Sequence, residues 1–538
     1  MRIFQVPERE TGNRKRSVIL IGMKHIFVVF VLVSSRLFGQ NPGDILFGMP
    51  GIHTVEINFS QPGWWDTLVN NKSLSDQTLQ DVYMAGTVVM DGNPIDSAGV
   101  RLKGNASYLH PGMKKPLRLE FDEYRPSQRY DGLTSLHLNN SAYDPTMLRE
   151  KLMLDVLHNH GIPAPRCAFA LVYFNGTFIG VYNMIEHIDK KFLQTNFNGN
   201  SGNLYKGDPN GTLEWYGNSQ SSYYSSYELK TNETQNDWSD LVNLIDVVNN
   251  SGSGFPAAIR QVLDVDGFLW YLAAQNVFGN MDSYVHNPHN YYLYHDSLTD
   301  KFDWIAWDVG LSLGVFPTIF NTRPVDMDVF YLPNDGRTPL TKHLFQYEEF
   351  RQIYLNAMCT FINEELNPSV LYPKIDSLAD VIRPWVYAES SSNKMYTTEQ
   401  FEGNLGYEHY SIWFISEIPG LKQFASQRIG NLSVQLCKEG WSCYQGTVAT
   451  PISDESIHVD PNPSDGKVII RFESPDARTA VNYRITDMYG NMILQEEVLI
   501  DMTTYYREMD FSQFAAGVYV LRVIGTCETI EKKIVIIK

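Results

Sequence analysis

Basic charge and cysteine are both scarce in this chain, and the two shortages exclude several classes of protein. Its 538 residues include 43 lysines and arginines against 61 aspartates and glutamates, for a formal net charge of −18. Binding of nucleic acid needs a basic face that neutralises phosphates, so we expect no nucleic-acid partner. The five cysteines show no Cys-x-x-Cys spacing, which argues against a zinc or thiol-redox motif.

Long hydrophobic runs are missing as well. The apolar run Ile26–Val33 is too short for a transmembrane helix, which needs about 20 apolar residues. It follows a basic stretch at residues 14–16 and a second methionine, Met23, which is an alternative start of the chain. A charged segment before a short apolar run is typical of a signal peptide. We therefore expect residues 1–40 to direct export and the mature chain to have no transmembrane segment.

Two cysteines lie close together near the end of the central region. Cys437 and Cys443 are near enough in sequence to form one disulfide in an oxidising compartment. Two free thiols are the alternative, because spacing alone does not reveal which cysteines pair.

The C-terminal part of the chain is rich in short β-type runs. Turn signals separate these runs, which are Lys467–Phe472, Val481–Asp487, Asn491–Val498, Val518–Ile524 and Lys532–Ile537. Alternating apolar residues with turns every ~8–12 residues predict a small all-β sandwich of the immunoglobulin-like kind. We place a linker at residues 441–455 and the sandwich at residues 456–538.

Four motifs in this sandwich carry a family resemblance. They are Pro461-Asn-Pro-Ser-Asp-Gly466, Asp487-Met-Tyr-Gly490, Ala516-Gly-Val-Tyr519 and the basic last strand Lys532-Lys533 to Lys538. Together they resemble the type A sorting domain of the type IX secretion system. The resemblance implies the type IX secretion machinery as a partner and a final location outside the cell or on its outer-membrane surface.

The region from residue 41 to 440 mixes strand and helix signals, which predicts an α+β fold. Residues 147–158 are periodic like an amphipathic helix that ends before a glycine. Hairpins are predicted at residues 168–185, around an Asn-Gly turn, and at residues 291–306. Beyond residue 338 the pattern is largely helical, and the Gly-, Ser-, Asn- and Tyr-rich stretch 198–227 is predicted to be a long surface loop or insertion.

Polar residues gather in the two loops that flank the second hairpin. Asp282, Asn287 and Asn290 precede it, and Asp308 follows its second strand. Carboxylate and amide oxygens suit Mg²⁺, which in proteins takes one or two carboxylates together with phosphate oxygens. Protein kinases show the same order of a catalytic aspartate, a metal-binding asparagine, a hairpin and a metal-binding aspartate.

The upstream order is compatible with phosphoryl transfer too. A strand with basic residues precedes a helix with the acidic residues Glu150 and Asp155, and the first hairpin ends at Glu186. Phosphoryl transfer depends mainly on positioning and on neutralising charge, which these groups can supply. The sequence has neither a Walker A motif nor Gly-x-Gly-x-x-Gly.

Seven segments in this order resemble the CotH (spore-coat protein H) kinase family. They are Arg101-Leu-Lys-Gly104-Asn105-Ala-Ser107, Lys114-Lys115-Pro-Leu-Arg118-Leu-Glu-Phe121, Leu148-Arg149-Glu150-Lys151-Leu152, Tyr173-Phe-Asn175-Gly176-Thr-Phe-Ile-Gly180-Val-Tyr182 with Glu186, Asn280-Met-Asp282, His289-Asn290-Tyr-Tyr-Leu-Tyr and Trp307-Asp308. The resemblance spans roughly residues 50–435. It implies an atypical, minimal protein-kinase-like fold. It also implies a kinase that uses ATP and Mg²⁺ or Mn²⁺ to phosphorylate serine or threonine of secreted or surface proteins.

The resemblance assigns the catalytic and metal-binding roles residue by residue. Asp282 is then the catalytic aspartate and Asp308 the metal-binding aspartate. Asn290 is the preferred metal-binding asparagine and Asn287 the second choice. Many members of the family read Trp-Asp-x-Asp, whereas this chain has Gly310 at the second position, which puts a two-metal site in doubt.

The same resemblance assigns the nucleotide contacts. Lys115 is the preferred phosphate-binding lysine, and Lys114 is the alternative, because a shift of one residue reverses which side chain faces inward. Arg101 and Arg118 add positive charge to the same site. Glu186, at the end of its strand, is expected to contact the nucleotide.

Two other functions compete with the kinase hypothesis. Extracellular ATP is scarce and one carboxylate is missing, so a catalytically silent kinase-like domain that serves as a surface binding protein or adhesin is the main alternative. A glycoside hydrolase with Asp282 and Asp308 as its acid/base pair is the other. It requires a separation of ~5–9.5 Å between the carboxyl groups, which a sequence does not reveal.

Overall fold

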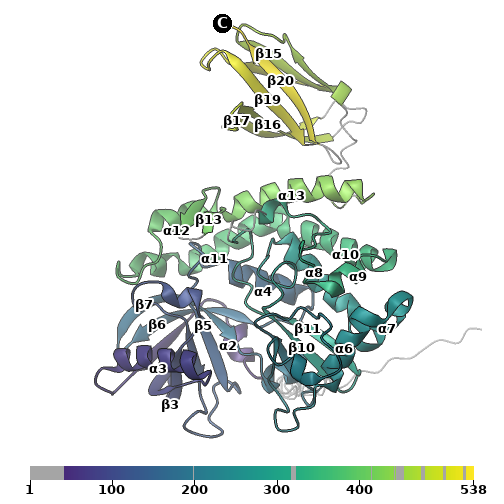
Figure 1. Cartoon of the computed structure of the whole chain (residues 1–538). Helices are drawn as coiled ribbons and strands as arrows, with labels where there is room; N and C mark the ends of the chain where they lie inside the picture. Colours follow the sequence, from purple (N-terminus) through teal and green to yellow (C-terminus); the bar gives the residue numbers. More distant parts are fainter. Residues whose placement is uncertain are drawn as a thin grey trace, which may run out of the picture.

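The computed structural model (Figure 1) describes residues 41–538 apart from 198, 317–322, 413–414, 442, 444–453, 474–478, 501–503 and 525–528. The predicted signal peptide, residues 1–40, lies outside the described residues, and so does most of the predicted linker. Within the described part of the chain, no helix has both the length and the apolar character needed to cross a bilayer.

The first part of the chain forms a closed seven-stranded barrel, drawn in purple to blue in Figure 1. Its strands are β1 (Ile52–Asn58), β2 (Met84–Met90), β3 (Asn93–Leu102), β4 (Leu117–Glu120), β5 (Ser135–Asn139), β6 (Cys167–Phe174) and β7 (Thr177–Glu186). Their order is β1-β2-β3-β4-β5-β7-β6, and β1 closes the barrel by pairing in parallel with β6. Every second residue of β1 and β2 is buried, because alternate side chains of a strand point into the barrel.

Three helices and one 3₁₀ turn accompany the barrel. Helices α2 (Asp44–Gly48) and α3 (Trp64–Thr78) contact its strands, and the 3₁₀ turn η1 (Ala106–Leu109) lies between β3 and β4. Helix α4 (Arg149–Asn159) confirms the amphipathic helix predicted near residues 147–158. The hairpin β6–β7 around Asn175-Gly176 is confirmed as well.

A second, four-stranded sheet carries the polar loops of interest. It contains β8 (Leu204–Gly207), β9 (Tyr227–Leu229), β10 (Tyr291–Asp296) and β11 (Lys301–Ala306), in the order β11-β10-β8-β9. The β10–β11 hairpin was predicted, but β8 and the start of β9 fall in the stretch 198–227 that was predicted to be a surface loop. That prediction is wrong for residues 204–207, which pair with the hairpin strand β10.

Helices pack around this second sheet, and most of them share one large apolar core with α4. They are α5 (Lys190–Asn196), α6 (Ser239–Asn250), α7 (Phe255–Val262), α8 (Val265–Val277), α9 (Pro339–Leu344), α10 (Glu348–Phe361), α11 (Pro368–Ala388), α12 (Thr398–Leu405) and α13 (Leu421–Lys438), with the short hairpin β12 (Tyr410–Ile412) and β13 (Ile415–Ile418). Helix α8 is buried on nearly all sides, as expected for a helix in the centre of a core. The largely helical character predicted beyond residue 338 is confirmed.

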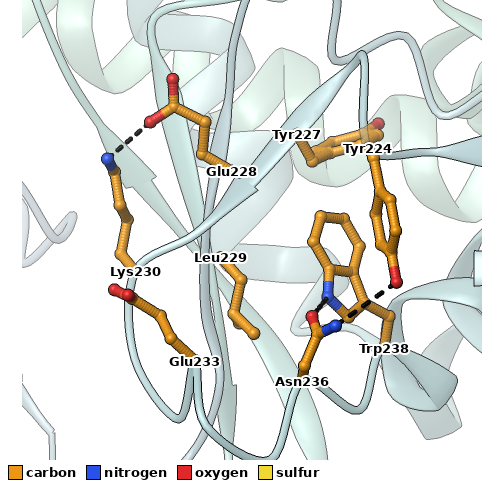
Figure 2. Close-up of a pocket in the computed structure, with 8 residues that line it drawn as sticks. All are labelled: Tyr224, Tyr227, Glu228, Leu229, Lys230, Glu233, Asn236 and Trp238. Carbon is orange, nitrogen blue, oxygen red and sulfur yellow. Dashed lines mark hydrogen bonds and ion pairs between the residues drawn. The ribbon is translucent and has the colours of Figure 1, made fainter. Parts of the chain in front are cut away.

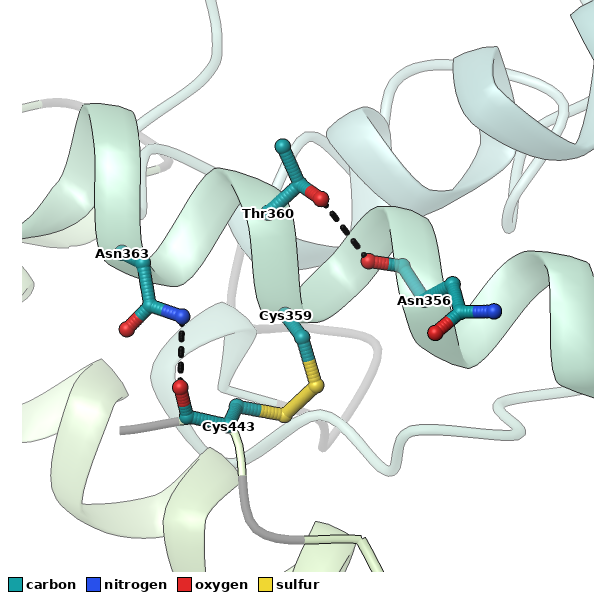
Figure 3. Close-up of a disulfide and its surroundings, with 5 residues drawn as sticks. All are labelled: Asn356, Cys359, Thr360, Asn363 and Cys443. Atoms are coloured by element: carbon teal, nitrogen blue, oxygen red, sulfur yellow. Dashed lines mark hydrogen bonds between the residues drawn. A yellow bond between two sulfur atoms is a disulfide. The ribbon is translucent and has the colours of Figure 1, made fainter. Parts of the chain in front are cut away.

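A disulfide joins two distant parts of the helical region (Figure 3). Cys359 in α10 is bonded to Cys443, which lies 84 residues later and just beyond α13. The Asn363 side chain donates a hydrogen bond to the carbonyl oxygen of Cys443. From the sequence, a Cys437–Cys443 disulfide and two free thiols were both open. In the structure the segment after α13 returns to α10, where Cys443 pairs with Cys359.

Among the described residues from 454 to 538, the regular elements are all strands apart from the 3₁₀ turn η7 (Asp454–Ser456). Strands β14 (Ile457–Asp460), β15 (Lys467–Glu473) and β18 (Thr504–Asp510) form one sheet. Strands β16 (Thr479–Asp487), β17 (Met492–Ile500), β19 (Gly517–Ile524) and β20 (Thr529–Ile536) form the other, in the order β17-β16-β19-β20. Their inward-facing side chains make a separate apolar core. The prediction of an all-β C-terminal unit is confirmed, as is the mixed α and β content of the rest.

Candidate active site

Asp282 lies in the loop between α8 and β10, where three side chains hold its carboxylate. His289 Nε2 donates to Oδ1 over 2.7 Å, and Asn287 donates to the same oxygen over 3.1 Å. Asn290 donates to Oδ2 over 3.0 Å and to the Asp282 carbonyl oxygen over 2.9 Å. The loop thus folds around one aspartate, and both asparagines that the sequence singled out are among its contacts.

These hydrogen bonds decide the charge of Asp282. Burial raises the pKa of its carboxyl, but the hydrogen bonds from His289, Asn287 and Asn290 and the attraction of the His289 ring outweigh burial, so the pKa is lower than usual. Burial lowers the pKa of His289, and Asp282 more than reverses this effect, so the pKa of His289 is raised. Asp282 is therefore an ionised, oriented carboxylate at neutral pH.

Asn290 directly precedes β10 and Asp308 follows β11, so both lie at the open end of this hairpin, and both have unusual backbone conformations. Their φ angles are +59° and +49°, in the left-handed region that only glycine, asparagine and aspartate enter readily. The Trp307 backbone N–H donates to the Asn290 carbonyl oxygen over 3.2 Å, which joins the two loops. Such local strain is concentrated at functional sites, and here it places both polar residues at one end of the sheet.

Asp308 as a whole residue is exposed, yet the protein surrounds its carboxyl closely enough for burial to raise the pKa. Lys103 is the strongest influence that lowers the pKa of Asp308, and Asp282 is the strongest charged group that raises it. The charge of Asp282 therefore reaches Asp308 and disfavours ionisation of its carboxyl.

Lys103 and Glu150 complete this group of charges. Lys103 follows the last residue of β3, and burial lowers the pKa of its ammonium to about 8 although Asp308 and Glu150 raise it. Glu150 lies in the first turn of α4, and burial together with the charge of Asp308 raises its pKa to about 7. Asn139 donates to Glu150 over 2.7 Å. A lysine, a glutamate and an aspartate from three different elements thus meet within electrostatic reach.

The raised pKa of Glu150 makes stability depend on pH. A carboxyl whose folded pKa exceeds its unfolded value destabilises the fold once it ionises, so its penalty grows as the pH rises from about 4.5 to about 7. Glu150→Gln should therefore match the parent at pH 5 and be more stable by on the order of 2 kcal/mol at pH 8. Melting temperatures of both proteins at the two pH values measure this. The exposed Glu233→Gln is the control, and an equal effect from it would contradict the assignment.

The two lysines predicted to bind phosphate lie elsewhere. Lys114 is completely buried, and its ammonium forms an ion pair of 2.7 Å with Glu389 at the end of α11. Lys115 donates to the backbone carbonyl oxygens of Tyr108, over 2.7 Å, and of His110. Both ammonium groups are thus engaged in holding the segment between β3 and β4. Neither lysine is among the charges that influence Asp308, whereas Lys103 is.

The remaining predicted nucleotide contacts divide in two. Arg101 and Arg118 both affect the pKa of Lys103, so their positive charge does reach the site, although both also pair with Asp81. Glu186 is buried, and its Oε1 forms an ion pair of 2.5 Å with Arg166 Nη2. Its carboxylate is satisfied inside the protein, so the structure does not place it as a nucleotide contact.

Lys103 and His289 are the functional candidates that sequence reasoning missed. Lys103 stands within the segment 101–107 quoted for the family resemblance, but nothing in its spacing separates it from Lys114 and Lys115. His289 immediately precedes Asn290 and was interpreted as a polar loop residue. Residues seven positions apart are too distant to touch within one regular helix or strand, so only the folded loop shows the contact of His289 with Asp282.

The polar groups suit a hard cation of the Mg²⁺ or Mn²⁺ kind. No group of three or more histidine, cysteine, aspartate or glutamate side chains arranged for a metal occurs among the described residues, but Mg²⁺ needs only one or two carboxylates when phosphate supplies further oxygens. Asp308, Asn290 and Asp282 offer such oxygens, and a cation would relieve the repulsion between the two carboxylates. An added Cβ at Gly310 would meet Glu150 Cβ at 4.0 Å, so Glu150 lies beside the position of the missing second carboxylate.

A separate pocket lies on the edge strand of the second sheet (Figure 2). Its lining residues are Tyr224, Tyr227, Glu228, Leu229, Lys230, Glu233, Asn236 and Trp238. Glu228 stands opposite Lys206 of β8, which in turn stands opposite Tyr292 of β10. The pocket is therefore on the same sheet as the β10–β11 hairpin but two strands away from β10, and it includes none of the charges described above.

Comparison with known proteins connects these features to two families. Residues 100–432, more than half of the chain, match the family described as CotH kinase protein. Residues 458–537 match the secretion system C-terminal sorting domain. A curated relative, the inner spore coat protein H of Bacillus subtilis (strain 168), is 28% identical over 286 residues, which cover 52% of this chain and 75% of the relative. The chain thus belongs to the CotH kinase protein family and ends in a type IX sorting domain, which indicates secretion and location at the cell surface.

Proposed function

We propose that this protein is an exported kinase that transfers the γ-phosphate of ATP to serine or threonine hydroxyls of secreted or surface proteins. The observation that carries the proposal is the meeting of Lys103, Glu150 and Asp308 beside the oriented carboxylate of Asp282. Protein kinases use the same parts: a lysine that binds the phosphates, a glutamate that pairs with this lysine, a metal-binding aspartate and an aspartate that accepts the proton. Membership in the CotH kinase protein family supports the same activity.

The chain's own residues divide the chemical work. Asp282, ionised and held by three side chains, accepts the proton of the substrate hydroxyl while that oxygen forms a bond to the γ-phosphorus. The bond from phosphorus to the β,γ-bridging oxygen breaks, and ADP leaves with its electron pair. Lys103 neutralises phosphate charge, and Glu150 keeps the ammonium in place. Asp308 and Asn290 would hold Mg²⁺ or Mn²⁺, which supplies further charge neutralisation when bound.

A radiolabel assay tests this function directly. The mature chain, residues 41–538, is incubated with γ-labelled ATP and Mg²⁺ or Mn²⁺, and label is measured on the protein itself and on casein. Asp282→Asn should lower the transfer rate about 10³-fold, because an amide cannot accept the hydroxyl proton. Asp237→Asn, a change in the loop before α6, is the matched control and should retain the parent rate.

The opposite result has a clear meaning. If the folded parent transfers no label and ATP with metal does not raise its melting temperature, the kinase function is wrong for this chain. The surface binding protein would then be the better hypothesis.

A further inference from the structure

A chain of three ring or guanidinium groups runs across the outer side of the barrel toward the second sheet. Arg118 on β4 stands opposite His137 on β5 in the strand register. Arg118 Nη2 lies 3.2 Å from His187 Nε2, and His187 Nδ1 lies 2.9 Å from His137 Nε2. The His137 ring then meets the Trp307 indole, with centroids 5.1 Å apart and an angle of 68° between the planes.

The direction of each hydrogen bond in this chain follows from chemistry. A guanidinium has only donors, so His187 Nε2 must accept from Arg118. The proton of the neutral His187 ring is then on Nδ1, which donates to His137 Nε2. The proton of His137 must consequently be on Nδ1. Burial and the neighbouring cations lower the pKa of both rings well below the usual value, which agrees with two neutral histidines.

The Nδ1–H group of His137 is therefore the last donor in this series of hydrogen bonds. His137 is 6% exposed, and its Nδ1 has no hydrogen-bonding N or O partner within the part of the chain that the structure describes. A buried donor without a partner costs about 1–3 kcal/mol. The indole of Trp307 is the ring that His137 contacts edge to face across the two sheets, and the face of an aromatic ring accepts an N–H weakly.

Trp307 is the residue directly before Asp308, and its ring is held on several sides. The Lys103 ammonium lies 6.0 Å from the centre of the indole. The Tyr292 ring stands perpendicular to it, with centroids 5.9 Å apart. The Trp307 backbone N–H donates a hydrogen bond to the Asn290 carbonyl oxygen. Whatever fixes this indole also limits the backbone of Asp308, whose φ of +49° leaves few alternative conformations.

We propose that His137 is a positioning residue, which donates from Nδ1 to the indole of Trp307 and so holds the Asp308 carboxylate in place for a divalent cation. The barrel is thereby connected to the hairpin through a side chain that touches neither nucleotide nor metal. The effect on phosphoryl transfer rests on the proposed function, but the effect on Trp307 and on metal binding does not.

Three variants of the mature chain separate the donor from the ring. His137→Phe keeps a ring of similar size and removes the N–H, whereas His137→Asn places an amide N–H near the position of Nδ1. His160→Phe is the control, because His160 also stacks on a tryptophan, Trp270, at 5.8 Å but lies outside this chain of hydrogen bonds. The probe is Mn²⁺ alone, with its dissociation constant measured by titration calorimetry. The Trp307 fluorescence is obtained by subtracting the emission of the matching Trp307→Phe protein.

The expected results are specific to the donor. His137→Phe should weaken Mn²⁺ binding about fivefold, which corresponds to ~1 kcal/mol, and should change the Trp307 emission. His137→Asn should stay within about twofold of the parent in Mn²⁺ affinity, and so should His160→Phe. If both changes at His137 weaken Mn²⁺ binding equally, ring packing rather than the N–H is responsible and the proposal is wrong.

The remaining outcomes distinguish this inference from the kinase function. If His137→Phe folds and binds Mn²⁺ like the parent, or if the parent itself binds no Mn²⁺, the positioning role is refuted. If the parent binds Mn²⁺ and the fivefold difference is found but no phosphate is transferred, the positioning role stands and the kinase function is refuted.

Discussion

Lys103→Met is expected to lower phosphoryl transfer by about 100-fold or more, whereas Lys115→Met should stay within about threefold of the parent. Lys103 shares an electrostatic environment with Asp308 and Glu150. The Lys115 ammonium is instead occupied by the carbonyl oxygens of Tyr108 and His110. Initial rates with γ-labelled ATP, together with the affinity for a fluorescent ATP analogue, measure both changes. Equal losses in the two variants would contradict the assignment of Lys103.

The pH dependence of nucleotide binding tests the role of Lys103 independently. Burial lowers the pKa of Lys103 to about 8, below its unfolded value, so its ammonium loses its proton as the pH rises through about 8. ATP affinity of the parent should therefore fall across that range, because the neutral amine no longer attracts phosphate. Lys103→Arg, whose guanidinium stays charged, should show a flatter profile. A profile as steep as that of the parent would assign the titration to another group.

Asp308→Asn should abolish measurable transfer, a loss of at least ~10³-fold, and at the same time make the protein more stable at neutral pH. Burial and the charge of Asp282 raise the pKa of Asp308, so ionisation of this carboxyl opposes folding. Above the raised pKa the destabilisation is fully present, and a neutral amide removes it. Melting temperature and transfer rate, measured at pH 7.5 on the same preparations, show both effects.

Asp303→Asn on β11 is the matched control for this variant. Burial and two neighbouring aspartates raise the pKa of Asp303 to about 7, but its side chain is not part of the polar loops. This change should also increase stability, and it should leave transfer within about twofold of the parent. A loss of stability in Asp308→Asn would show that the carboxylate is a structural necessity rather than a functional group maintained at a cost to the fold.

The polar loops were predictable from sequence because they flank a strong hairpin signal. Alternating apolar residues locate β10 and β11, and the ends of two adjacent strands must lie together. Asp282, Asn290 and Asp308 were therefore expected near one another. Their convergence in the structure needs no contact from a remote part of the chain.

The lysine and the second sheet were not predictable, for two different physical reasons. A basic side chain on or after a strand is usually solvated, so only tertiary contacts separate Lys103 from Lys114, whose partner Glu389 lies 275 residues away. Strand β8 has only four residues and lies among glycines, serines and asparagines. Its pairing with β10 depends on a partner more than 80 residues later, which local periodicity does not contain.

The Cys359–Cys443 bond has a mechanical consequence. Cys443 is the last described residue before the segment that leads to the sorting domain, so a pull on an anchored C-terminus reaches the helical region at this point. The load then passes through a covalent bond into α10, near the centre of the core, rather than along α13. Tension that would otherwise unwind α13 from its C-terminal end would bypass this helix through the disulfide.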